Sequence, residues 1–189
     1  MGLPTAAVIA SEDGFLAGQL QHALNSGLFR AYVNPDLVGV ELCGAAKNVI
    51  ALAAGGVDGL GLGDNAKASL IARGLAEMTR LGEAAGARQE TFAGLAGIGD
   101  LVVSCCSPKT RNRHAGELIA QGLTPERAVA EIGQTVEGLT TAPIRSSGSL
   151  SPCWCSYDFW TPCAMSGDCS SSATTTPHVS ASKPNFARV

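Results

Sequence analysis

Residues 39–56 read GVELCGAAKNVIALAAGG, and this stretch decides how the rest of the chain is interpreted. Apolar side chains occupy all faces of a helix from about residue 38 to residue 54, with no polar stripe. A helix of this kind is typical of one that is buried within a bundle. The pair Gly55-Gly56 is expected to end it. The stretch therefore predicts a helical domain with this segment at its centre.

The segments that follow predict further helices, so residues 37–143 are expected to form one all-helical domain. The helices cover residues 64–85, 111–121, 125–132 and a segment that opens after Glu137. The first has Asp64 or Asn65 as its N-cap and Gly86 as its stop. Its inward positions are Leu70, Leu75, Met78 and Leu81. Thr124 followed by Pro125 is typical of a helix start.

The N-terminal residues 1–36 follow another pattern. Residues 4–10 and 29–33 are short apolar runs of strand type, and residues 15–24 between them have helical spacing after the capping residues Ser11, Glu12 and Asp13. This order predicts a βαβ unit. Two parallel strands cannot cover their own faces, so the unit is expected to be the remnant of a larger sheet.

Residues 144–189 form a tail of different composition. Serine and threonine are dense, and prolines interrupt every candidate helix or strand. Such a segment buries too little apolar surface to offset its ordering entropy, so disorder is expected. An alternative is a zinc site made by Cys153, Cys155, Cys163, Cys169 and His178. Because the pattern opens with C-x-C and contains no second tight pair, no metal is expected.

Charge and hydropathy exclude several classes of protein. The formal net charge is −3 and the pI is near 5.6, so nucleic acid is not an expected partner. No apolar run approaches the roughly 18–20 residues that span a bilayer. The first ten residues lack a signal peptide's cationic start, and the chain is expected to be cytoplasmic. Cys43, Cys105 and Cys106 lie in apolar surroundings and are expected to be small buried thiols.

Lys47 is the first candidate for chemistry. It stands among apolar neighbours in the central helix, where loss of hydration can turn a lysine into a proton donor near neutral pH. The alternative is a lysine that reaches water along the helix or pairs with Glu41. Spacing alone favours this alternative.

Two further places carry suitable groups. Asp100 follows the glycine-rich run GLAGIG, where it can hydrogen-bond a substrate hydroxyl or cap the next short helix. Thr110, Arg111 and Asn112 open a helix, and a helix N-terminus with an arginine attracts anions. Taken alone, this triplet is better explained as a capped helix start with an exposed arginine.

Taken together, these motifs resemble one family. Three segments are similar to bacterial NAD(P)-dependent glycerol-3-phosphate dehydrogenases. They are the sequence from GVELCGAAKN through GLGDNAKASL, the segment TFAGLAGIGDLVVSCCSPKTRNRHAG and the final TVEG. The resemblance spans about residues 2–143. It implies a mainly α fold, a helical substrate domain of the 6-phosphogluconate dehydrogenase C-terminal-like type, after the end of a Rossmann α/β domain.

The resemblance also implies a function. The reaction is the interconversion of dihydroxyacetone phosphate and sn-glycerol 3-phosphate, which serves phospholipid synthesis, with NAD or NADP as cosubstrate. A small-molecule substrate is the expected partner, and a homodimer is left open. By the same likeness Lys47 is the catalytic residue, and Asp100, Thr110, Arg111 and Asn112 join it in contacting the substrate. Arg111, Thr135 and Glu137 match cofactor contacts, although the family commonly has valine at position 135.

Two departures from the family limit these expectations. No G-x-G-x-x-G follows a first strand, so the main cofactor-binding part is missing from residues 1–189. After residue 145 the sequence no longer resembles the family, as a shifted reading frame or gene-model error would produce. The chain by itself is therefore expected to be an inactive fragment.

A helix-turn-helix binding module is the alternative function. Residues 114–135 contain two short helices joined by a Gly-Leu-Thr turn. The second helix offers Glu126, Arg127 and Glu131, which suit an anionic DNA groove poorly.

Overall fold

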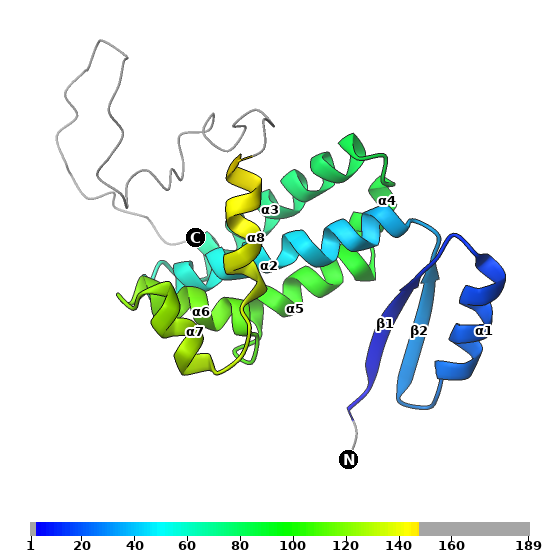
Figure 1. The fold of residues 1–189 in the computed structure, drawn as a ribbon, viewed down its shortest axis with the longest axis horizontal. Helices are drawn as coiled ribbons and strands as arrows, with labels where there is room; N and C mark the ends of the chain where they lie inside the picture. Colours follow the sequence, from blue (N-terminus) through cyan, green and yellow to red (C-terminus); the bar gives the residue numbers. More distant parts are fainter. Residues whose placement is uncertain (1–2, 148–189) are drawn as a thin grey trace, which may run out of the picture. The chain divides into compact units, whose positions relative to one another are not determined.

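The computed structural model describes residues 3–147 as two strands and a series of helices (Figure 1). The elements are β1 (Thr5–Ala10), α1 (Gly14–Leu24), β2 (Phe29–Asn34), α2 (Leu37–Gly59), α3 (Asp64–Ala84), α4 (Gln89–Ala93), the π-helix η1 (Leu95–Gly99), α5 (Asp100–Cys106), α6 (Arg111–Ala120), α7 (Pro125–Ile132) and α8 (Glu137–Ser147). The prediction of a mainly α fold preceded by a βαβ unit is confirmed.

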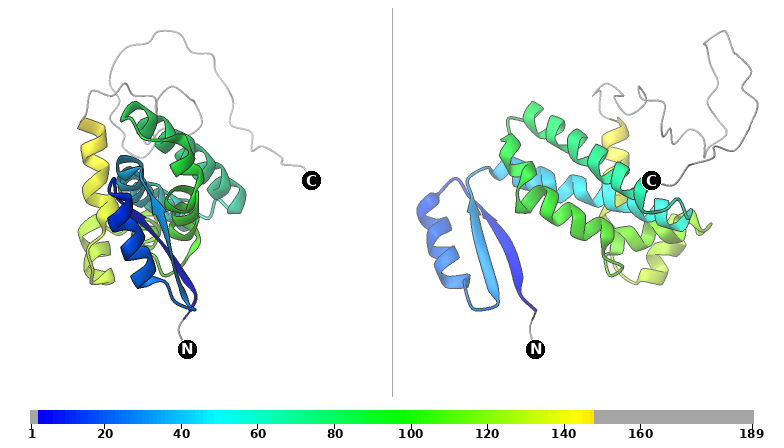
Figure 2. Two further views of the ribbon diagram at one scale, coloured as in Figure 1. Left: turned by 90° about the vertical axis from the view of Figure 1, so that its right-hand side faces the viewer. Right: turned by 180° about the vertical axis from the view of Figure 1, so that it is seen from behind.

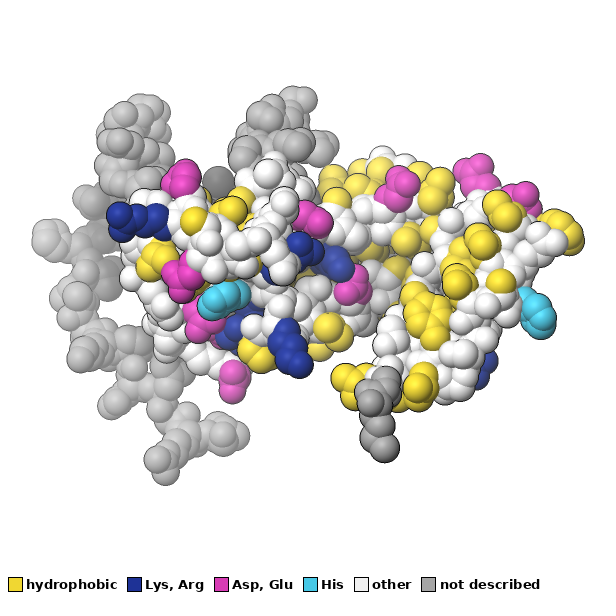
Figure 3. All heavy atoms as spheres, turned by 60° about the horizontal axis from the view of Figure 1, so that its bottom comes forward, with side chains coloured by type: hydrophobic (Ala, Val, Ile, Leu, Met, Phe, Trp, Pro, Cys, Tyr) yellow, Lys and Arg dark blue, Asp and Glu magenta, His cyan; other side chains and the backbone are white. Residues whose placement is uncertain are grey.

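The βαβ unit consists of β1, α1 and β2. The strands pair in parallel, with Thr5 opposite Phe29 and Ala10 opposite Asn34. Asp13 caps α1, because its carboxylate accepts hydrogen bonds from the backbone N–H groups of Phe15 (2.9 Å) and Leu16 (3.0 Å). Apolar side chains remain exposed over this unit (Figure 3); they include Phe15, Leu16, Leu20, Leu24, Tyr32 and Val33.

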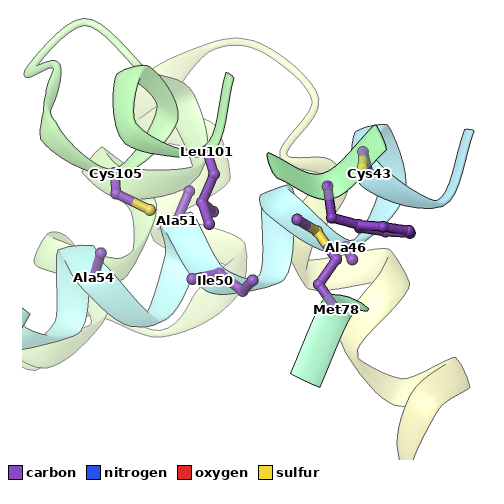
Figure 4. Packing of buried hydrophobic residues seen from close by; sticks show 9 residues of the cluster. Cys43, Ala46, Ile50, Ala51, Ala54, Met78, Leu101 and Cys105 are labelled. Carbon is purple, nitrogen blue, oxygen red and sulfur yellow. The ribbon is translucent and has the colours of Figure 1, made fainter. Parts of the chain in front are cut away.

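Helix α2 is the central element of the helical domain, as the sequence predicts. It contacts α3, α5, α6 and α8, and Figure 2 shows this arrangement from two further sides. The core formed around it (Figure 4) consists of Cys43, Ala46, Ile50, Ala51, Ala54, Met78, Phe92, Leu101 and Cys105. By length and composition α2 could also cross a membrane. Its packing inside the bundle explains the same apolar sequence.

The predicted end of the central helix at Gly55-Gly56 is wrong, because α2 continues to Gly59. Gly55 of α2 and Gly116 of α6 allow the backbones of these two helices to approach each other closely. A Cβ atom on Gly55 would lie 1.8 Å from the carbonyl oxygen of Arg113, and one on Gly116 would lie 1.8 Å from that of Leu52. This close packing offsets the cost of about 1 kcal/mol that glycine imposes within a helix.

Replacing Gly116 by alanine is expected to lower the free energy of unfolding by about 1–3 kcal/mol, because the two helices must move apart. Urea unfolding followed by circular dichroism measures the change. Gly44→Ala in α2 is the matched control, since nothing lies within 4 Å of the added Cβ. It should raise the stability by about 0.5–1 kcal/mol. Equal stability of Gly116→Ala and the unaltered chain would show that the contact is not tight.

Helix α3 begins differently from the prediction and ends as predicted. Its N-cap is Gly63, with φ at 85°, and Asp64 is its first residue rather than its cap. Gly86 follows the end with φ at 86°. The N–H of Ala87 donates to the carbonyl of Gly82 at 2.9 Å, and that of Gly86 to the carbonyl of Glu83 at 3.0 Å. These bonds satisfy the final carbonyl groups of the helix.

The last two helices test the predicted C-terminal boundary. Thr124 and Pro125 open α7 as predicted, and the Thr124 hydroxyl accepts a hydrogen bond from the Arg127 N–H at 3.4 Å. Helix α8 opens at Glu137 and continues to Ser147, so it extends past the boundary placed at residue 144. The remaining tail, with its expected disorder and the cysteines and histidine of the zinc alternative, lies outside the described residues.

The glycine-rich region before Asp100 contains helices that the sequence did not reveal. Residues 89–93 form α4, and the run from Leu95 to Gly99 forms the π-helix η1. A Cβ atom on Gly97 would lie 2.0 Å from the carbonyl oxygen of Phe92, so this turn requires glycine. Helix α5 then starts at Asp100, which places its carboxylate at the first position of a helix.

Candidate active site

Lys47 and Asp100 form an ion pair between the middle of α2 and the start of α5. The Lys47 side chain is 23% exposed and that of Asp100 is 43% exposed. Lys47 is therefore only partly buried, and its partner is Asp100 rather than Glu41. The expectation that these two residues lie within reach of each other is confirmed. A partly exposed ammonium and carboxylate can both meet a bound molecule.

Asn48, the residue after Lys47 in α2, connects α2 to two other helices, α6 and α8. Its amide group donates to a carboxylate oxygen of Glu137 at 2.6 Å, and its oxygen accepts from the amide of Asn112 at 2.9 Å. Asn48 is 7% exposed. Asn48 lies in the motif GAAKN, but neither the motif nor its spacing predicts a role for it. The signal that could have found it is a second polar residue, directly after the lysine, in an otherwise apolar helix.

These contacts with Asn48 bring two predicted site residues, Asn112 and Glu137, to the middle of α2. Asn112 also accepts a hydrogen bond from the backbone N–H of Gly138 at 2.8 Å. Its side-chain oxygen and one amide hydrogen are therefore used within the protein, which leaves its second amide hydrogen and its backbone N–H for a ligand. Glu137 has an exposed side chain apart from its contact with Asn48.

Thr110 precedes α6 and does not cap it with its side chain. Its hydroxyl lies 2.7 Å from the carbonyl oxygen of Ser104 and 2.8 Å from that of Ser107, so its hydrogen is directed to these acceptors. The hydroxyl oxygen still has lone pairs that can accept a hydrogen bond. The first N–H groups of α6 lack a side-chain cap, and such groups attract anions.

Arg111 and Arg113 differ in their surroundings. Arg111 is exposed, and within residues 3–147 no carboxylate forms an ion pair with it. Arg113 is held by Asp58 at 2.6 Å and by Glu117 at 3.2 Å, and Lys67 reaches the same aspartate at 2.5 Å. Burial alone raises the pKa of Asp58, but these two cations hold it below its usual value. Arg111 is thus the arginine available to a ligand.

Thr135 stands in the exposed connection between α7 and α8. It lines a shallow hollow whose other residues are Val129, Gly133, Gln134, Val136, Leu139 and Thr140. A second hollow, between the sheet and η1, is lined by Ala6, Val8, Tyr32, Val33, Asn34 and Leu95. Neither of these two hollows includes Lys47 or Asp100.

The cysteines near the site are not activated for nucleophilic chemistry. Burial, followed by the charges of Asp36 and Asp100, raises the pKa of Cys43 to about 11. Burial raises the pKa of Cys105 to about 12. Both therefore remain thiols at neutral pH. The expectation that Cys106 is buried is wrong, because it is exposed.

A helical domain built around one buried helix and preceded by a βαβ unit defines a class of protein, in which a helical C-terminal domain follows an α/β domain. The family model described as the NAD-dependent glycerol-3-phosphate dehydrogenase C-terminus matches residues 36–147. The chain therefore belongs to the NAD-dependent glycerol-3-phosphate dehydrogenase family through this domain.

Individual relatives agree with this family. A glycerol-3-phosphate dehydrogenase [NAD(P)+] of Symbiobacterium thermophilum is 62% identical over 141 residues, which cover 75% of this chain and 41% of the relative. The crystal structure of the Coxiella burnetii enzyme has a TM-score of 0.74 at 46% identity and covers 76% of this chain and 45% of that one. A Saccharomyces cerevisiae glycerol-3-phosphate dehydrogenase has a TM-score of 0.66 at 32% identity, covering 74% and 43%. The chain spans about two fifths of the length of the curated relatives it matches.

Proposed function

We propose that this chain supplies the substrate-binding half of an NAD(P)-dependent oxidoreductase that interconverts dihydroxyacetone phosphate and sn-glycerol 3-phosphate. The observation that carries the proposal is the Lys47–Asp100 pair beside the start of α6. Family membership supports the reaction. The domain division we propose is residues 1–36 as the end of a nucleotide-binding domain, residues 37–147 as the substrate domain, since α8 ends at Ser147, and the remaining residues as a tail of different composition.

The roles of the residues follow from their chemistry. Lys47 donates a proton to the substrate's C2 oxygen during reduction and stabilises the negative charge that develops there. Asp100 orients the Lys47 ammonium through their ion pair and accepts a hydrogen bond from a substrate hydroxyl. Arg111 and the N–H groups at the start of α6 bind the phosphate. The remaining amide hydrogen of Asn112 and the hydroxyl oxygen of Thr110 complete the substrate contacts.

The cofactor is proposed to be NAD or NADP, which when bound supplies or accepts the hydride. The exposed Arg111, Thr135 and Glu137 fit contacts with one side of such a molecule. The site is incomplete in residues 1–189, because no glycine-rich phosphate loop follows β1. We further propose a cytoplasmic location, a role in glycerophospholipid synthesis, and a homodimer as the assembly.

The helix-turn-helix alternative receives no support from the exposed residues. Helix α7 presents Glu126, Arg127 and Glu131 to solvent. Two carboxylates and one guanidinium are a poor match for a polyanion, whose binding depends on neutralised phosphates. A DNA-binding role is therefore not proposed.

The experiment that tests the proposal places residues 3–147 in the Symbiobacterium thermophilum relative in exchange for the segment that they match, so that the relative's own sequence is joined to both ends. We expect this protein to oxidise NADH or NADPH in the presence of dihydroxyacetone phosphate. Glyceraldehyde 3-phosphate, an isomer with the carbonyl at C1, is the control substrate and should give little turnover. A folded protein that shows no dihydroxyacetone phosphate dependence would contradict the proposed function.

A further inference from the structure

A buried carboxylate lies at the opposite end of this substrate region from α6, at the start of α2. Asp36 is 8% exposed, and both of its oxygens are used. One accepts from the N–H of Gly39 at 3.0 Å; the other accepts from the N–H of Arg88 at 2.8 Å and from the Thr91 hydroxyl at 2.6 Å. We call these residues, together with Asn34, the Asp36 cluster.

The neighbouring residues are shaped to fit this carboxylate. The side-chain oxygen of Asn34 accepts from the N–H of Asp36 at 2.9 Å, and its amide reaches the Thr91 hydroxyl at 3.4 Å. A Cβ atom on Gly39 would lie 2.2 Å from an Asp36 oxygen, so only glycine leaves it room. Burial by itself raises the pKa of Asp36, but the hydrogen bonds from Thr91, Arg88 and Gly39 keep it below its usual value. The Asp36 carboxylate is therefore charged, and each of its oxygens accepts a hydrogen bond from the protein.

The Asp36 cluster joins the two segments that carry the Lys47–Asp100 pair. Lys47 lies eleven residues after Asp36 in the sequence, and three turns of α-helix return it to the same face of α2 about 16 Å further along. Asp100 lies nine residues after Thr91, across η1. The run from α4 to α5 is thus attached to α2 at the Asp36 cluster and again at the ion pair.

Apolar packing alone does not set this register. Phe92 and Leu101 bury this run against α2, but hydrophobic contacts are non-directional. Hydrogen bonds to a carboxylate have defined lengths and angles. A shift of the run along α2 would break the two that come from this run, those from the Arg88 N–H and the Thr91 hydroxyl. Asp36 therefore fixes the position of Thr91 along α2. The π-helix η1 connects Thr91 to Asp100, so the position of Asp100 along α2 follows from that of Thr91.

We propose that Asp36 is a positioning residue for the Lys47–Asp100 pair: its carboxylate sets the register of α4, η1 and α5 against α2 and so brings Asp100 to Lys47. The value of this pair to catalysis rests on the proposed function. The geometric statement does not, and it can be tested without substrate or turnover.

The test is a proton–nitrogen NMR spectrum of the lysine ammonium groups in the full chain at low temperature. Ammonium groups held in ion pairs exchange slowly enough with water to be observed, so we expect resonances from Lys47 and Lys67. Lys47→Arg and Lys67→Arg assign them. Asp36→Asn should remove the Lys47 resonance and keep that of Lys67. The matched control, Asp58→Asn, should do the reverse, because Asp58 is the partner of Lys67.

Circular dichroism reports whether each variant is folded. If Asp36→Asn does not fold, Thr91→Val decides the question, since it removes one hydrogen bond to Asp36 and keeps both backbone bonds; the Lys47 resonance should then weaken. A folded Asp36→Asn protein with an unchanged Lys47 resonance would overturn the proposal. So would an unchanged resonance in Thr91→Val when Asp36→Asn is unfolded, or a Lys47 resonance missing from the unaltered chain while that of Lys67 is present.

Discussion

Lys47→Met is expected to lower kcat for dihydroxyacetone phosphate reduction about 10²–10⁴-fold, the usual contribution of a positioned proton donor. Methionine keeps the unbranched apolar stem and removes the ammonium that we propose as the donor to the C2 oxygen. The Lys47 side chain is partly exposed, so its removal leaves no large cavity in the core. Steady-state kinetics of the joined protein, in which residues 3–147 replace the matching segment of the relative, measure the loss.

The control for this prediction is Lys67→Met. Lys67 also forms an ion pair with an aspartate, Asp58 of α2. Asp58 is paired with Arg113 as well, and neither of these partners is a proposed site residue. This change should lower stability and leave kcat within a few fold at a temperature where the protein is folded. If Lys47→Met retained most of the activity, Lys47 would not be the proton donor.

Residues 1–189 alone are expected to show no measurable oxidation of NADH or NADPH with dihydroxyacetone phosphate. Hydride transfer requires the nicotinamide at about 3–3.5 Å from the reacting carbon, and this positioning supplies much of the rate. The cofactor contacts that we propose for Arg111, Thr135 and Glu137 hold only one side of a dinucleotide. The chain has no glycine-rich loop after β1 to hold the pyrophosphate at a helix N-terminus.

The measurement compares this chain with the joined protein at equal concentration. Exposed apolar residues of the βαβ unit favour association, so light scattering must show that the chain stays dispersed. Turnover by the isolated chain equal to that of the joined protein would refute the view that a second domain completes the site.

The central helix was predictable because its sequence is apolar on every face. The end of this helix was not predictable, because the close contacts that require Gly55 and Gly116 exist only when α6 is packed against α2. The low helix propensity of glycine predicts that a helix ends there, whereas here tertiary packing offsets the free-energy cost of glycine within the helix. The π-helix before Asp100 was missed for a related reason, since Gly97 is required by a backbone contact with Phe92 that spacing does not reveal.

The site was predictable in part. Spacing alone did not single out Lys47. The resemblance to a family assigned Lys47 and Asp100 to one site, and the structure shows that the two residues form an ion pair. The internal bonds of Asn112 and the direction of the Thr110 hydroxyl depend on where neighbouring helices place their partners. Asn48 and Asp36 act through such contacts between distant segments. The sequence marks Asn48 only as a second polar residue after Lys47, and it offers no comparable signal for Asp36.

The central claim is that Lys47, Asp100 and the start of α6 form one site for glycerol 3-phosphate. The most direct measurement is an NMR titration of the isotope-labelled chain with sn-glycerol 3-phosphate, using glycerol as the control. We expect the largest amide shifts at Arg111, Asn112 and Asp100, together with a shift of the Lys47 ammonium, and their loss in Arg111→Met. No saturable shift at these residues, or shifts confined to other parts of the chain, would contradict the claim.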